Sequence, residues 1–68
     1  MRTVLEALSM RLKALRGKRG WTQTDLAKRA RVSAGYIARL ETGRHDPKLG
    51  TLVKIAKALG CPVGELLG

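Results

Sequence analysis

The chain is poor in aromatic residues and in cysteine. It has no phenylalanine, and its aromatic side chains are limited to Trp21 and Tyr36. A hydrophobic core must therefore be built from Leu, Ile, Val and Ala. The single cysteine, Cys61, excludes a disulfide within the chain and is expected to be a buried filler between the last two helices. Together with the lack of a signal sequence, this favours a reducing, cytoplasmic location.

Long apolar runs and catalytic groupings are missing as well. The longest apolar stretches have two or three residues, too short to cross a membrane. One histidine, one cysteine and five scattered acidic residues provide no nucleophile–base pair and no metal-ligand spacing, and no glycine-rich loop could hold a phosphate. We therefore expect no enzyme activity, no metal and no cofactor.

Positive charge is what the chain has in excess. Fourteen Lys and Arg residues against five Asp and Glu residues give a net charge of +9. So large a surplus on a small protein implies an anionic partner, with nucleic acid first. A cationic coat on a membrane surface or on nucleic acid of any sequence is the alternative. It would need an apolar helix face open to lipid, whereas the apolar stripes here converge on one core.

The spacing of apolar residues predicts an all-α fold. Leucines that step by three and four residues indicate five short helices around one core, with residues 1–68 forming a single domain. The first helix is expected to begin at Thr3, which can form a capping box with Glu6, and to end at Gly20. A chain of this length has no room for a second, ligand-sensing domain.

The second half of the chain continues the pattern. After a loop over residues 42–48, a fourth helix is expected to end at Gly60, and Pro62 opens a short last helix. The side chains expected to point inward from the first and fourth helices are Leu5, Leu8, Leu12, Leu15, Leu49, Leu52, Ile55, Ala56 and Leu59.

Between these helices, two short amphipathic patterns follow each other almost without a break. The first begins with a possible capping box of Thr22 and Asp25, and the second begins at Ser33, a favourable N-cap residue. Only Arg31 and Val32 separate them, so the two helices must turn sharply. One helix can then brace the other, whose outer face is left free to enter a DNA groove.

This segment, TQTDLAKRARVSAGYIARL followed by LETGRHDP, resembles the helix-turn-helix of the phage repressor and Cro family, also called Xre-type regulators. The resemblance continues through LVKIAKALGCPVGELL and covers about residues 12 to 68. It implies a repressor-like fold with the helix-turn-helix at the second and third helices. The matching residues are Gln23, Leu26, Ala27, Val32, Ser33, Ile37 and Leu40.

The helix after Ser33 is the candidate recognition helix. If Ile37 and Leu40 face inward, its outward positions are Ala34, Gly35, Ala38 and Arg39. Arg39 can donate two hydrogen bonds to guanine, whereas the alanines can only touch thymine methyl groups. The resemblance places base reading at Ala34, Gly35 and Arg39.

Contacts to the DNA backbone are expected around this helix. Gln23 opens the supporting helix, where free amides favour an anion, and Arg44 follows the recognition helix as a phosphate clamp. Tyr36 can either donate to a phosphate or pack beside the fourth helix, and His45 is expected to be merely exposed. The complete set of predicted phosphate contacts is Gln23, Thr24, Ser33, Tyr36, Gly43 and Arg44.

Two further expectations come from the resemblance. Arg31 occupies a turn position where the family often has glycine because the backbone there is left-handed, which costs an L-residue about 1–2 kcal/mol. Arg16 and Glu41 align with an ion pair that joins the first helix to the end of the recognition helix.

The function predicted from these features is sequence-specific regulation of transcription. We expect a repressor that binds a two-fold operator in double-stranded DNA as a homodimer, because one recognition helix reads too few bases to be selective. The dimer contact is expected near Val63, Leu66 and Leu67. The alternative is an antitoxin or a restriction–modification controller, which would also bind a protein partner such as a toxin.

Overall fold

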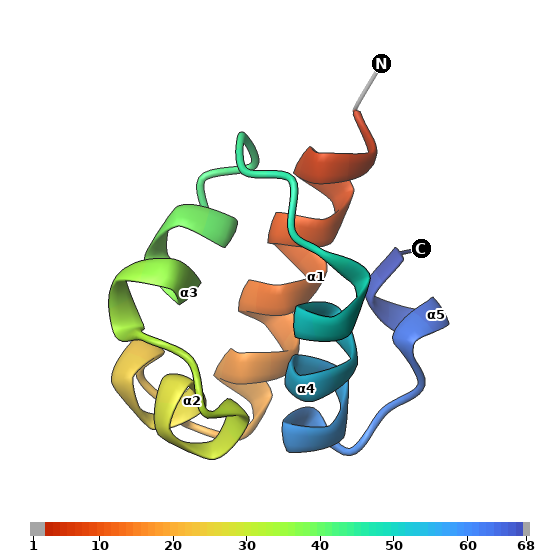
Figure 1. Cartoon of the computed structure of the whole chain (residues 1–68). Coiled ribbons are helices and arrows are strands. Elements are labelled where there is room, and N and C mark those ends of the chain that lie inside the picture. Colours follow the sequence, from red (N-terminus) through yellow and green to blue (C-terminus); the bar gives the residue numbers. More distant parts are fainter. Residues whose placement is uncertain (1–2, 68) are drawn as a thin grey trace.

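The computed structural model describes residues 3–67. Over this range the chain is all-α, as predicted, with five helices and no strand (Figure 1). The helices are α1 (Val4–Lys18), α2 (Gln23–Ala30), α3 (Ala34–Leu40), α4 (Leu49–Leu59) and α5 (Val63–Leu67).

Short-range hydrogen bonds start the first two helices. At α1, Thr3 accepts the amide proton of Glu6 at 3.1 Å, and the Glu6 carboxylate accepts that of Thr3 at 2.9 Å. Thr22 and Asp25 form the same box at the start of α2, at 3.0 and 2.9 Å. Each box supplies partners for amides that a helix start leaves without one. Both predicted capping boxes are confirmed.

Left-handed backbone follows three of the helices. Gly20 and Gly60 have φ values of 66° and 70°, which confirms them as the turns that end α1 and α4. The Arg19 guanidinium also donates to the carbonyl of Leu59, so the end of α1 is tied to the end of α4. At the end of α2 the left-handed residue is Arg31, with φ 58° and ψ 44°, as the resemblance implied.

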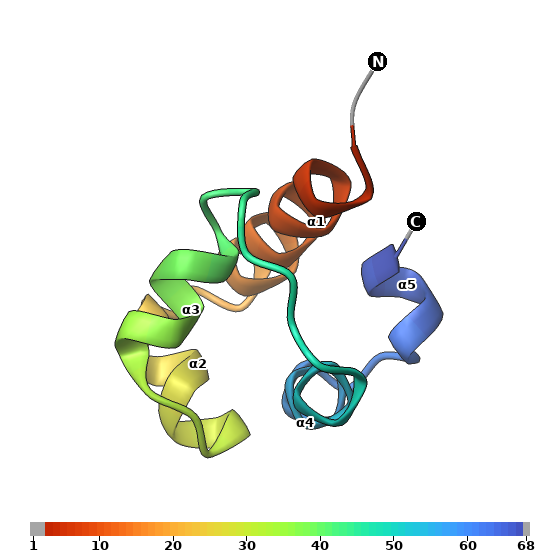
Figure 2. The same cartoon turned by 45° about the horizontal axis from the view of Figure 1, so that its top comes forward.

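The helices enclose one cluster of buried side chains. α2 packs against α3 and α4, while α1 packs against α3 and α5. Both views place α3 and α5 on opposite sides of the molecule (Figures 1 and 2). The buried apolar residues are Leu8, Leu12, Leu26, Ala27, Ala30, Ile37, Leu40, Leu52, Ile55, Ala56, Leu59 and Leu66.

The predicted core needs one correction and two adjustments. Leu49 is 67% exposed, so its predicted burial was wrong: it is the first residue of α4, one turn ahead of the buried Leu52. Leu5 and Leu15 are only half-buried. Cys61 is also half-buried against the core, and this burial raises the pKa of its thiol. Within residues 3–67, no helix is long and apolar enough to cross a membrane.

Candidate nucleic-acid interface

The α3 helix has one face in the core and one face in solvent. Ile37 and Leu40 are 0% and 1% exposed, whereas Gly35 and Arg39 lie on the exposed side. Ala34 and Ala38 are half-buried at its edges. The helix begins where the hydroxyl of Ser33 accepts the amide proton of Tyr36 at 3.0 Å. All four predicted base readers therefore have some surface on the outer side of α3.

Arg39 belongs to a row of three side chains along α3 and the following loop. Its guanidinium carbon lies 5.8 Å from the centre of the Tyr36 ring, and that ring meets the His45 ring edge-on, at 5.1 Å and 84°. His45 was expected to be exposed, but it is half-buried in this contact. No local spacing joins a loop histidine to a helical tyrosine nine positions earlier, so the pattern gave no signal for it.

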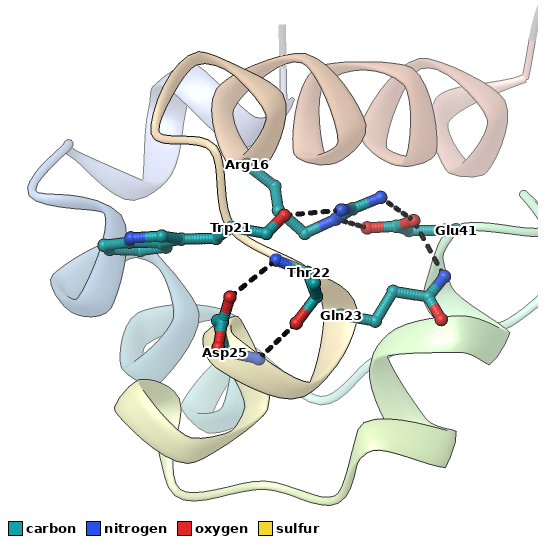
Figure 3. A network of polar contacts seen from close by, with 6 residues as sticks. All are labelled: Arg16, Trp21, Thr22, Gln23, Asp25 and Glu41. Atoms are coloured by element: carbon teal, nitrogen blue, oxygen red, sulfur yellow. Dashed lines mark hydrogen bonds and ion pairs between the residues drawn. The ribbon is translucent and has the colours of Figure 1, made fainter.

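The far end of α3 is held by a polar network (Figure 3). The Arg16 guanidinium of α1 donates from Nε to Oε2 of Glu41 at 2.7 Å and from Nη2 to Oε1 at 2.9 Å. Its Nη1 donates to the carbonyl of Trp21 at 2.7 Å. Gln23 completes the network by donating from Nε2 to Oε1 of Glu41 at 3.0 Å. The two residues paired by resemblance thus touch, and Gln23 joins them.

The network sets the charge state of Glu41, whose carboxylate is nearly inaccessible to solvent. Burial alone raises the pKa of Glu41, but the hydrogen bonds from Arg16 and Gln23 outweigh it and hold the pKa below its ordinary value. In turn, the hydrogen bond to Glu41 raises the pKa of Arg16 despite its partial burial. Both groups are therefore charged at neutral pH, and the pair joins the C-terminal end of α3 to α1 and to the start of α2.

Gln23 therefore has a structural contact in addition to its predicted role as a phosphate ligand. It is half-buried, and its amide donates to Glu41. Because Gln23 and Glu41 touch, the first turn of α2 lies beside the last turn of α3. The exposed Thr24 and Arg44 flank that same end, on α2 and on the loop after α3.

Gly43 lies against α1 rather than in solvent. It is buried, its φ is 78°, and its amide donates to the carbonyl of Leu40 at 3.3 Å. A Cβ at this position would come within 3.2 Å of the Ser9 hydroxyl and 3.4 Å of the Glu6 backbone. Gly43 thus lets the loop pack on α1, and its contact to a phosphate stays a prediction.

The three residues predicted for the dimer contact differ in exposure. Leu66 is 0% exposed and belongs to the core of its own chain, because the one-and-a-half turns of α5 direct it toward α1 and α4. Leu67 is 44% exposed and Val63 is half-buried. Only these two of the three predicted residues offer surface to a second copy.

Known proteins are similar to this chain over most of its length. A sequence family described as Helix-turn-helix matches residues 12–66. The immunity repressor protein of Bacillus phage phi105 is 41% identical over 61 residues, which make up 90% of this chain and 42% of that repressor. This chain spans less than half the length of the first curated relatives it matches.

Two solved structures are similar over nearly the full chain. The clp gene regulator ClgR from Corynebacterium glutamicum has a TM-score of 0.87 at 36% identity, covering 98% of this chain and 87% of that one. The restriction-modification controller protein C.AhdI from Aeromonas hydrophila has a TM-score of 0.87 at 31% identity, covering 91% of this chain and 94% of that one.

Proposed function

Because the chain belongs to the Xre-type helix-turn-helix family of DNA-binding transcriptional regulators, we propose that it represses transcription by binding a two-fold operator as a homodimer. Its recognition from sequence as a member of this family is confirmed. The family is not a class of enzymes, which agrees with the lack of catalytic groupings. A regulator that acts on a prokaryotic chromosome would work in the cytoplasm.

The exposed face of α3 is the observation that carries the proposal. The helix spans Ala34–Leu40, and an α-helix with its side chains is about 10–12 Å in diameter, which fits a major groove about 12 Å wide. Arg39 is the one long charged side chain on that face and would read a guanine. Thr24, Ser33 and Arg44 surround the helix and would position it on the phosphates.

Dimerisation follows from the limited reach of one such helix. Two copies would read successive major grooves if their recognition helices were about 34 Å apart. The molecule measures 31 × 23 × 22 Å, with α5 on the side opposite α3. The two copies would meet through the exposed Leu67 and the half-buried Val63.

Selection of bound fragments from random DNA tests the proposal. We expect enrichment of an inverted repeat, and failure to enrich any sequence would refute it. On the selected site, Arg39→Ala should cost about 1–3 kcal/mol at one or two base positions and relax the preference there. Arg44→Ala should instead weaken all sequences alike. Equal losses on every sequence for both variants would show that Arg39 does not read a base.

The salt dependence of binding gives a second, independent measurement. If each subunit neutralises about four phosphates, log affinity should fall with log salt concentration at a slope near −7 for the dimer. Arg44→Ala removes one contact from each subunit, so it should reduce the slope of the dimer by about two. Binding that does not respond to salt would contradict the electrostatic part of the proposal.

A restriction–modification controller is the second candidate function. The similarity to C.AhdI supports it, because this chain covers 94% of that controller protein with a TM-score of 0.87. Binding of the purified protein to the DNA upstream of its own gene, next to genes for a methyltransferase and a nuclease, would favour this candidate. The antitoxin alternative needs a protein partner and stays a prediction.

A further inference from the structure

A basic cleft lies between the C-terminal end of α2 and the C-terminal half of α4. Figures 1 and 2 show these two helices side by side, and they pack against each other. The cleft is shallow and open to solvent, with a volume of about 370 Å³. Its lining consists of four cationic residues and two alanines: Arg29, Ala30, Arg31, Lys54, Lys57 and Ala58.

Of the four cations, only Arg29 has a recorded interaction with an acidic group among residues 3–67, the Asp25 carboxylate one turn earlier on α2. None of the lining residues is acidic, and no ion pair within residues 3–67 involves Arg29, Arg31, Lys54 or Lys57. Like charges held together on two packed helices repel each other, and a bound anion would remove this repulsion. The concentration of charge thus indicates a ligand with several negative charges close together.

Arg31 gives an independent reason to assign the cleft a role. It is the only residue other than glycine with a positive φ among residues 3–67. α1 and α4 end in the same left-handed conformation with Gly20 and Gly60, which adopt it without the strain of a side chain. At the end of α2 the protein instead accepts this strain and places a guanidinium on the wall of the cleft. Backbone strain of this kind is concentrated at functional sites.

We propose that this cleft binds a compact phosphate-rich anion, of the class of pyrophosphate or the triphosphate chain of a nucleotide. Guanidinium and ammonium groups from two helices can donate charge-assisted hydrogen bonds to adjacent phosphate groups. Phosphates of a DNA backbone have the same chemistry. A free anion is favoured because the site lies between α2 and α4, whereas the predicted DNA contacts lie on α3, on the loop after it and at the start of α2.

The chain contains its own reporter for this site. Trp21 is the only tryptophan, and the guanidinium carbon of Arg29 lies 4.3 Å from the centre of its ring. An anion that draws Arg29 into the cleft should change the fluorescence of Trp21. Titration with tripolyphosphate at constant ionic strength should give a saturable change with one site per chain, and calorimetry should give the same stoichiometry. A change that only rises linearly would overturn the proposal.

Three variants distinguish binding in this cleft from general electrostatic attraction of an anion to a cationic protein. Arg31→Gly and Lys57→Gln should each weaken tripolyphosphate binding about tenfold or more. Arg31→Gly should stay folded, because glycine relieves the left-handed strain. Lys18→Gln removes the same charge from an exposed position on α1 and should change the affinity less than twofold. If Lys18→Gln weakens binding as much as the other two, the proposal fails.

A second experiment distinguishes a site for a free anion from a contact to the DNA backbone. Binding to a short random-sequence duplex, without tripolyphosphate, should be no weaker for Arg31→Gly than for Lys18→Gln. If Arg31→Gly weakens duplex binding further and leaves tripolyphosphate binding unchanged, the cleft is a DNA contact and the proposal is wrong. Because neither experiment uses an operator, the result does not depend on whether the protein is a dimeric repressor.

Discussion

Neutralising Glu41 and Arg16 separately and together measures how strongly the polar network holds α3. Arg16→Met leaves a carboxylate that is 5% exposed with one remaining partner, Gln23, at 3.0 Å. Loss of one partner from a buried ion pair costs about 3–5 kcal/mol. The low end applies here, because Gln23 keeps its hydrogen bond. A domain of 68 residues has about 3–10 kcal/mol in total, so this variant should be close to unfolding.

Glu41→Gln keeps the shape of the side chain but removes its charge. The Arg16 side chain is 20% exposed and can recover part of its hydration, so we expect a smaller loss of about 2 kcal/mol. In the double variant no buried charge is left without a partner. The stability lost in the double variant should therefore be about 2 kcal/mol smaller than the sum of the losses in the two single variants.

Urea unfolding followed by helical circular dichroism at pH 7 provides the measurement. Lys18→Met is the control for loss of a charge from α1, and it should stay within about 0.5 kcal/mol of the parent protein. Single losses that add to within about 0.5 kcal/mol would refute the argument, since they would show that Arg16 and Glu41 do not stabilise each other.

Two more predictions concern acid and the loop after α3. Because folding lowers the pKa of Glu41, its stabilisation is complete above pH 4.5 and is lost as the pH falls through the lower value of the folded protein. Urea unfolding at decreasing pH should thus show a steeper loss of stability for the parent than for Glu41→Gln, and equal slopes would contradict this. In thermal unfolding, Gly43→Ala should lose more stability than Gly20→Ala. Both variants lose about 1–2 kcal/mol because alanine is strained in left-handed backbone. Only at Gly43 does the new Cβ also come within 3.2 Å of the Ser9 hydroxyl. Equal losses would show that the loop moves away from α1 without cost.

Features that depend on a few neighbouring residues could be predicted from the sequence. The capping boxes at Thr3 and Thr22 need residues three positions apart, and a glycine after a basic last turn marks the end of α1. The inward face of α3 also followed from local spacing, because Ile37 and Leu40 step by one helical turn. Signals of this kind do not depend on which elements pack together.

Features that depend on where neighbouring helices end could not be predicted in this way. Leu49 continues the apolar stripe of α4, yet it is 67% exposed because the stripe runs past the core at the start of the helix. Leu66 and Leu67 are adjacent and chemically identical, but one is 0% and the other 44% exposed. A helix of five residues is too short for periodicity to assign its faces.

Contacts between side chains from different helices and loops could not be predicted from the sequence pattern either. The pairing of Arg16 with Glu41 came from resemblance alone, and nothing in the pattern placed Gln23 on the same carboxylate. The edge contact between Tyr36 and His45 depends on the path of the loop after α3. Side chains from separate elements meet only once the helices are packed, so their spacing along the chain carries no trace of the contact.

Presentation of the recognition helix depends on residues at both of its ends. A helix of seven residues is far too short to be stable alone, so α3 must be held by its surroundings. At its start, the left-handed turn at Arg31 and the cap at Ser33 fix where the helix begins. At its end, Glu41 fastens it to α1 and α2, while Ile37 and Leu40 anchor it in the core between. If α3 is the recognition helix, as we propose, the position of Arg39 in the groove is set by side chains outside the exposed face of α3, and weakening them should reduce DNA affinity without removing any contact to DNA.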